Sequence, residues 1–246
     1  MCFTIEIHKS RTEIESRFNK KFESGSENFE PKYYVSAFEF PKLPVITQEK
    51  FEIISMINWG LIPSWLTENS KIDDFRKNTL NAKAETLYDK PSFQNPIKNK
   101  RCLVIAHGFF EWQHNRKIKV PYYIKLKNDD LFSFAGIYDE WADKNSGEIF
   151  NGFSIITCEA NTLLAKIHNS KKRMPVIIDK KNERNWIDPS LNENQITELL
   201  KPYNENELTA WPIGNLINER NQNKNVPELL ERRDYSDYNN EINFLT

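Results

Sequence analysis

The sequence is poor in glycine and cysteine, and each shortage argues against a class of protein. Seven glycines among 246 residues, with no GxGxxG or GxxxxGKS/T pattern, argue against a glycine-rich phosphate-binding architecture. The three cysteines, Cys2, Cys102 and Cys158, are odd in number and widely spaced, which indicates reduced thiols rather than a disulfide framework. His8, His107 and His114 have no metal-ligand spacing with one another or with the cysteines. We therefore expect no metal site and no cofactor.

The sequence also lacks long apolar runs and a large net charge. No apolar stretch approaches the roughly 18 residues of a membrane span, and the start MCFTIEIHKSR lacks a secretory signal, so we expect a cytoplasmic protein without a membrane partner. With 34 basic and 35 acidic residues the net charge is −1, so DNA binding would require a local basic cleft. A monomer is the default expectation.

Apolar and aromatic segments with strand character fill much of the chain. The patterns predict strands at 3–7, 33–38, 51–59 and 174–178 and a series of strands between 101 and 157. Helical character is found at 11–22, 159–167, 183–187 and 194–201, whereas the prolines of 40–45 predict a loop. Since strands and helices do not alternate regularly, the prediction is an α+β fold with mostly antiparallel sheets, followed by a polar tail.

Cys2 becomes the first residue if Met1 is removed, as aminopeptidases do when the second side chain is small. The chain would then begin with an amine and a thiol on adjacent carbons, with reference pKa values of about 7.7–8.0 and about 8.5. Such a pair can trap an aldehyde as a Schiff base and close a thiazolidine ring, which an internal cysteine cannot do. The alternative is an incidental, buried cysteine.

Glu111 and His168 are candidates for proton transfer. Glu111 lies in the aromatic segment HGFFEW, where apolar surroundings would raise its proton affinity, and side-chain alternation directs it with Phe109 away from Phe110 and Trp112. The alternative is a glutamate on the solvent face of a strand. His168 follows a helical segment and can move a proton, or it can serve as a C-terminal helix residue interacting with the dipole.

Several other residues have a possible DNA-binding role and an ordinary structural alternative. Asn81 can hold a polar intermediate and Lys83 a phosphate, or they are a turn asparagine and a surface lysine. The basic run 171–173 can meet a DNA backbone or remain a solvated surface. The indoles of Trp59, Trp65 and Trp112 can stack on unpaired bases or pack in the core.

Taken together and in order, the motifs resemble the SRAP (SOS response-associated peptidase) family. The resemblance extends from residue 2 to about 230 and is carried by Met-Cys at the start, WGLIPSW at 59–65, NAKAET at 81–86, HGFFEW at 107–112 and IHNSKKRMPVII at 167–178. FAGIYDEW at 134–141 and ITCEAN at 156–161 also resemble family segments. It implies a single domain, 1–230, of curved, barrel-like, largely antiparallel sheets with short flanking helices and a cleft for single-stranded DNA. Residues 231–246 would be the tail.

The resemblance also implies a chemistry and a set of site residues. Cys2 would bond covalently to the aldehyde of an abasic site in single-stranded DNA as a thiazolidine. Asn81 would hold the linkage, Glu111 would transfer protons and His168 would assist the Schiff base. The residues expected to contact DNA are Lys83, Trp59, Pro63, Trp65, Arg173, Met174 and Pro175.

The chain departs from the family pattern at Lys83, where arginine is usual, at His107, where aspartate is common, and in HNSKKRMP, which contains inserted lysines. Lysine keeps the charge but loses the bidentate fork of arginine. None of these changes removes a proposed reacting group. Two other functions use the same residues: a cysteine peptidase with an N-terminal nucleophile, and a non-covalent module that binds single-stranded DNA.

Overall fold

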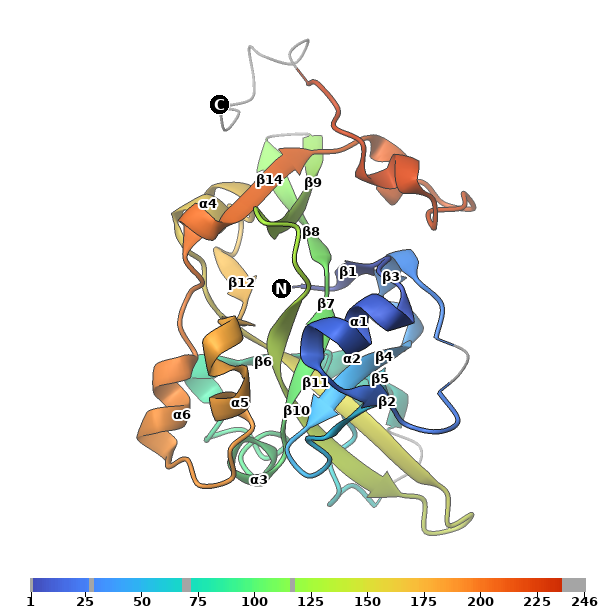
Figure 1. The fold of residues 1–246 in the computed structure, drawn as a ribbon, viewed down its shortest axis with the longest axis vertical. Coiled ribbons are helices and arrows are strands. Elements are labelled where there is room, and N and C mark those ends of the chain that lie inside the picture. The colour runs from blue at the N-terminus through green and yellow to red at the C-terminus, as the bar shows by residue number, and fades with distance from the viewer. Residues whose placement is uncertain (1, 27–28, 68–71, 116–117, 236–246) are drawn as a thin grey trace.

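Strands form most of the computed structural model, which describes residues 2–26, 29–67, 72–115 and 118–235. One sheet has five strands, all antiparallel to their neighbours (Figure 1). Their order across the sheet is β14 (Leu208–Pro212), β9 (Ile118–Leu126), β8 (Gly108–Asn115), β1 (Thr4–Ile7) and β3 (Lys32–Ser36).

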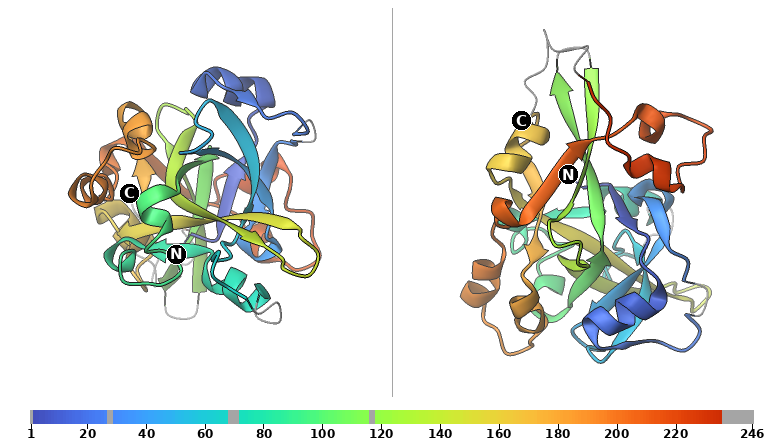
Figure 2. Two further views of the ribbon diagram at one scale, coloured as in Figure 1. Left: turned by 90° about the horizontal axis from the view of Figure 1, so that it is seen from below. Right: turned by 45° about the horizontal axis from the view of Figure 1, so that its top comes forward.

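The second sheet closes on itself. Its order is β12 (Arg173–Pro175), β11 (Ile149–Glu159), β10 (Phe132–Ala142), β7 (Arg101–Ala106), β4 (Lys42–Thr47), β5 (Ile53–Trp59) and β2 (Lys21–Phe22), with β13 (Ile177–Ile178) on β10 and β6 (Asn81–Lys83) on β11. A parallel pairing of β11 with β5 completes a ring of five strands, seen end-on in Figure 2. The predicted α+β fold with curved, mostly antiparallel sheets is confirmed.

Two glycines make this closure possible. Gly60 follows β5 with φ of +109°, a conformation that favours glycine, and its N–H donates to the carbonyl of Phe153 at 2.9 Å. Gly152 on β11 lies so close to the Gly60 carbonyl that a Cβ there would overlap it. The two backbones therefore approach at a distance that only glycine permits.

Short helices flank the sheets, among them α4, which ends next to the candidate site. Asn161 caps α4 by accepting a hydrogen bond from the Leu164 N–H, and His168 is the residue at its C-terminal end. The helices are α1 (Arg11–Phe18), α2 (Ile72–Asn78), α3 (Pro96–Asn99), α4 (Thr162–Ile167), α5 (Glu183–Trp186) and α6 (Glu193–Leu199). Within the described ranges, no helix is long and apolar enough to cross a membrane.

Three local predictions need correction. The helix predicted over 11–22 ends at Phe18, because Asn19 turns left-handed and Lys21–Phe22 pairs with β5. The predicted loop at 40–45 is instead largely strand β4, because Leu43 and Val45 are buried between β5 and β7. Asn81, for which a turn was the structural alternative, lies instead in a strand, because residues 81–83 form β6 by pairing with β11.

The segment predicted as a polar tail begins with ordered contacts. Arg232 forms a β-bridge with Ile213, and the Tyr235 hydroxyl donates to the Ile213 carbonyl at 2.8 Å. Residues 231–235 therefore contact the body of the protein next to β14. The rest of the predicted tail, 236–246, lies outside the described residues, and the boundary at 230 stays a prediction.

Candidate active site

The register of β1 directs Cys2 toward β6 and β8. Ile5 pairs with Phe109 and Glu6 with Gly108, so β1 lies antiparallel along the start of β8. Just before β1, the carbonyl of Cys2 accepts a hydrogen bond of 2.9 Å from the side-chain amide of Asn81 on β6. Two segments far apart in the sequence therefore fix the position of Cys2.

The thiol of Cys2 is buried. Its side chain has no exposed surface, and Sγ donates to the carbonyl of Thr4 at 3.8 Å. Burial and the nearby Glu111 carboxyl raise the pKa of the Cys2 thiol far above its usual range. In this form of the chain the sulfur is therefore a neutral thiol without access to solvent.

Glu111 and His168 lie next to each other in apolar surroundings. Nδ1 of His168 is 3.7 Å from Oε2 of Glu111 and 2.8 Å from the carbonyl of Arg173. Burial raises the pKa of Glu111 to about 8 and lowers the pKa of His168 to about 4. At pH 7 the pair is consequently a protonated carboxyl and a neutral imidazole.

Side-chain alternation along β8 agrees with the sequence prediction. Phe109 packs in the main core, whereas Phe110 and Trp112 belong to a second cluster near β14. Glu111 therefore points with Phe109 into the protein and has only 3% of its surface exposed. The expected carboxyl in an apolar environment is present, and the solvent-facing alternative is wrong.

A cleft of about 660 Å³ adjoins this cluster at Asn81. Lys83 and Lys90 line it together with the rings of Phe75 and Phe93, so it offers both cations and aromatic surface. Lys90, Phe75 and Phe93 were not singled out in the sequence, because no motif marks them and only the fold brings them beside β6. The full lining is Asp74, Phe75, Asn78, Thr79, Asn81, Lys83, Thr86, Lys90, Pro91, Ser92 and Phe93.

The tryptophans differ sharply in exposure. Trp65 is 48% exposed, contacts Phe75 edge-on and donates from Nε1 to the carbonyl of Pro91, a residue of the cleft. Trp59 is fully buried, donating to the carbonyl of Leu80 at 2.8 Å. For Trp59 the structure favours the alternative of core packing over base stacking, whereas Trp65 has a ring surface open to solvent.

Other residues expected to contact DNA are also divided by burial. Pro63, Met174 and Pro175 are buried, so little of their surface is open to DNA in this structure, and their role as DNA contacts stays a prediction. Arg173 is half-buried and donates to the Glu85 carboxylate and the Thr157 carbonyl, each at 2.6 Å, so its charge is already balanced. Lys83 is exposed on the cleft.

These features define a strand-rich α+β protein in which a buried cysteine at the second position, an amide, a carboxyl and an imidazole converge beside a surface cleft. A family model described as SOS response associated peptidase (SRAP) matches residues 1–220. The chain therefore belongs to the SRAP family, as its motifs predicted.

Individual relatives are similar over most of the chain. The chain is 33% identical over 233 residues to the abasic site processing protein YoqW of Bacillus subtilis (strain 168), covering 94% of this chain and 99% of that protein. It is 30% identical over 198 residues to the abasic site processing protein HMCES of Xenopus tropicalis, covering 72% of this chain and 57% of HMCES. A crystal structure of a protein from Bacteroides thetaiotaomicron has a TM-score of 0.89 at 38% identity, covering 94% of this chain and all (100%) of that one.

Proposed function

We propose that this protein processes abasic sites in single-stranded DNA by forming a covalent thiazolidine through Cys2 after Met1 is removed. The observation that carries the proposal is the convergence of Cys2, Asn81, Glu111 and His168 from four separate segments beside one cleft. Membership of the SRAP family and the names of the curated relatives support the same substrate.

The proposed reaction has two bond-forming steps. The α-amine of Cys2 adds to the aldehyde of the ring-opened sugar, and the carbinolamine loses water to give an imine. The thiol then adds across the C=N bond, with sulfur bonding to carbon and the thiol proton passing to nitrogen. Aldehyde and aminothiol thus give thiazolidine and water, with no oxidant or reductant.

The neighbouring groups suit these steps. Loss of water from the carbinolamine needs a proton donor, and Glu111 is protonated at neutral pH because burial raises its pKa to about 8. His168 is neutral there and can accept the proton that the amine loses. The Asn81 amide holds the Cys2 carbonyl, and so fixes the backbone from which both nucleophiles extend.

Because Cys2 is fully buried, its sulfur must become accessible before it can react with a sugar. The reaction requires that removal of Met1 gives a sugar aldehyde a path from the cleft at Asn81 to the sulfur. A thiol reagent applied to the chain with and without Met1 measures this path. Cys2 should react faster in the processed chain, and equal, slow labelling of both forms would contradict the proposal.

A denaturing gel tests the covalent step. The processed chain, incubated with single-stranded DNA that carries one abasic site, should give a shifted band that survives heat. The band should be absent for Cys2→Ala and for a chain with a blocked amino terminus, and should form normally for Cys158→Ala, a matched substitution of another buried cysteine. DNA binding without an adduct would favour a non-covalent module, and peptide cleavage without an adduct would favour a peptidase.

A further inference from the structure

A second cluster of polar side chains lies at the C-terminal end of β1 and includes none of the candidate active-site residues. The cluster consists of Glu6, His8 and His107. His107 lies 101 residues after Glu6 in the sequence, immediately before β8. One possible ligand atom from each of the three side chains lies within 4.8 Å of the others. Spacing among histidines and cysteines did not indicate this group, because the third member is a carboxylate.

The carboxylate of Glu6 is the centre of the cluster. Its Oε1 is 2.5 Å from Nδ1 of His8, and its Oε2 is 2.9 Å from Nδ1 of His107. The Tyr123 hydroxyl donates to Oε2 at 2.5 Å. A Cβ at Gly108 would overlap the Tyr123 ring, so this glycine lets the phenol reach Glu6.

The hydrogen bonds of His107 assign its two nitrogens. Nε2 faces two acceptors, the backbone carbonyl of Asp129 at 3.3 Å and the Asp129 carboxylate at 3.2 Å, so Nε2 carries a proton. Nδ1 of His107 faces the Glu6 carboxylate at 2.9 Å, so the two atoms can share a proton, and a metal ion bound between them would take the place of that proton.

A carboxylate or carbonyl on the outer nitrogen is the usual second partner of a metal-binding histidine, because it fixes the tautomer and makes the inner nitrogen more basic. Asp129 is suited to that role rather than to ligation, since Lys9 and Lys125 already engage its carboxylate. His8 stacks on Tyr33 with ring centroids 4.9 Å apart, which holds its ring plane.

From this arrangement we infer that Glu6, His8 and His107 bind a divalent transition-metal ion of the zinc type. Two imidazoles and one carboxylate are a known zinc ligand set, with bonds of about 2.0–2.2 Å that place ligand atoms about 3.3 Å apart in a tetrahedron. The two nitrogen–oxygen distances, 2.5 Å for His8 and 2.9 Å for His107, would each need to lengthen by less than about 1 Å to reach that spacing. The His8 side chain is 27% exposed, so the cluster lies close to the surface of the protein.

The ion has a structural consequence that is independent of the proposed reaction. It ties β1 to the start of β8, the same pairing that sets the register between Cys2 and Glu111. Bound metal would therefore stabilise the folded chain by mass action, as any ligand of the native state does.

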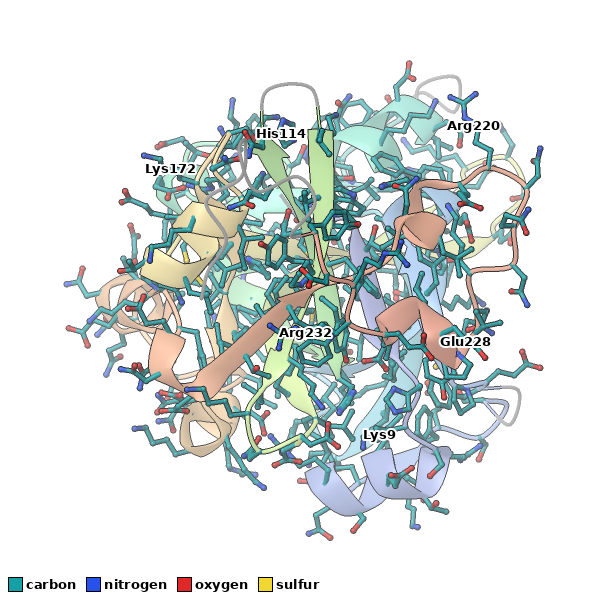
Figure 3. The ribbon with its side chains drawn as sticks, turned by 90° about the horizontal axis from the view of Figure 1, so that it is seen from above. Lys9, His114, Lys172, Arg220, Glu228 and Arg232 are labelled. Carbon is teal, nitrogen blue, oxygen red and sulfur yellow. The ribbon has the colours of Figure 1, made fainter. Side chains whose placement is uncertain are left out.

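Zinc titration of the full, chelator-treated chain by calorimetry tests the inference. We expect one ion per chain, and at least a tenfold loss of affinity in His8→Ala, a partly exposed residue whose truncation leaves the core intact. His114→Ala is the matched control, because His114 is exposed on β8 and lies across the molecule from Lys9, the neighbour of His8 (Figure 3). Cys2→Ser should bind as the original chain does, which separates this site from the thiol.

Cobalt supplies a second, spectroscopic measurement. The original chain and His114→Ala should give the intense visible bands of a four-coordinate cobalt ion, and His8→Ala should lose them. Zinc should raise the melting temperature of the first two proteins and not of the third. Failure of the original chain to bind zinc, or equal binding by His8→Ala, would overturn the inference, whatever the outcome of the crosslinking experiment.

Discussion

Replacing Glu111 with glutamine tests the proposed chemistry most directly. Glutamine keeps the size and polarity of the side chain but cannot release a proton. With a pKa of about 8, Glu111 is roughly 90% protonated at pH 7, whereas an ordinary glutamate would be protonated in roughly 0.3% of molecules. General acid catalysis is worth about 100-fold to 10,000-fold, so adduct formation by Glu111→Gln should be at least about 100-fold slower at pH 7.

The pH dependence of the same variant is equally informative. Above pH 8 the original chain loses its proton donor while the Cys2 amine, with a reference pKa of about 7.7–8.0, becomes a better nucleophile, so the rate should pass through a maximum near pH 8. His168 is neutral throughout this range, because its pKa of about 4 is far below it. The rate for Glu111→Gln should instead rise through pH 8 and level off.

The assay is a time course of the gel-shifted adduct at several pH values between 6 and 10. Glu140→Gln, the same substitution at an exposed carboxylate on β10, is the control and should follow the original chain. Non-covalent affinity for the DNA, measured with Cys2→Ala as the background, should change little. Adduct formation by Glu111→Gln at the original rate, or with the same maximum, would refute the role of the carboxyl.

Three further outcomes follow from the structure. Glu111 has a raised pKa in the folded state, so its contribution to stability is complete below the unfolded-state pKa of about 4.5 and is lost as the pH rises toward 8. In thermal melts, the stability of Glu111→Gln relative to the original chain should therefore increase between those two pH values. Asn81→Ala removes the hydrogen bond to the Cys2 carbonyl and should slow adduct formation while costing only about 0.5–1.5 kcal/mol in urea unfolding; an unchanged rate would contradict the positioning role. Arg101→Met leaves the carbonyls of Trp186, Ile97 and Asp188, the first two of them in buried hydrogen bonds, without this donor and should lower the free energy of unfolding by several kcal/mol, and a loss below about 1 kcal/mol would show that those carbonyls find other donors.

The strand-rich fold class and the family were predictable because both depend on local patterns. The alternation of HGFFEW assigned Glu111 to the inner face of its strand, and the core clusters confirm it. Motif order carried the family assignment, and a family model that matches residues 1–220 agrees with it.

Exposure of the aromatic residues was not predictable in the same way. Trp59 and Trp65 occur in one short motif, yet one indole is buried on Phe153 and the other is open to solvent. The difference arises because β11 covers the end of β5 when the ring of strands closes, and the chain then leaves the sheet before Trp65.

By itself the sequence determined which groups are present: a cysteine at the second residue, a carboxyl among aromatic side chains and a histidine at the end of a helical segment. Only the tertiary structure decided which of them meet. Pairing of β1 with β8 and of β6 with β11 brings Cys2, Asn81 and Glu111 together, and the same β1 pairing brings Glu6 to His107. Local periodicity cannot encode such meetings, because they depend on hydrogen bonds between strands that are distant in the chain.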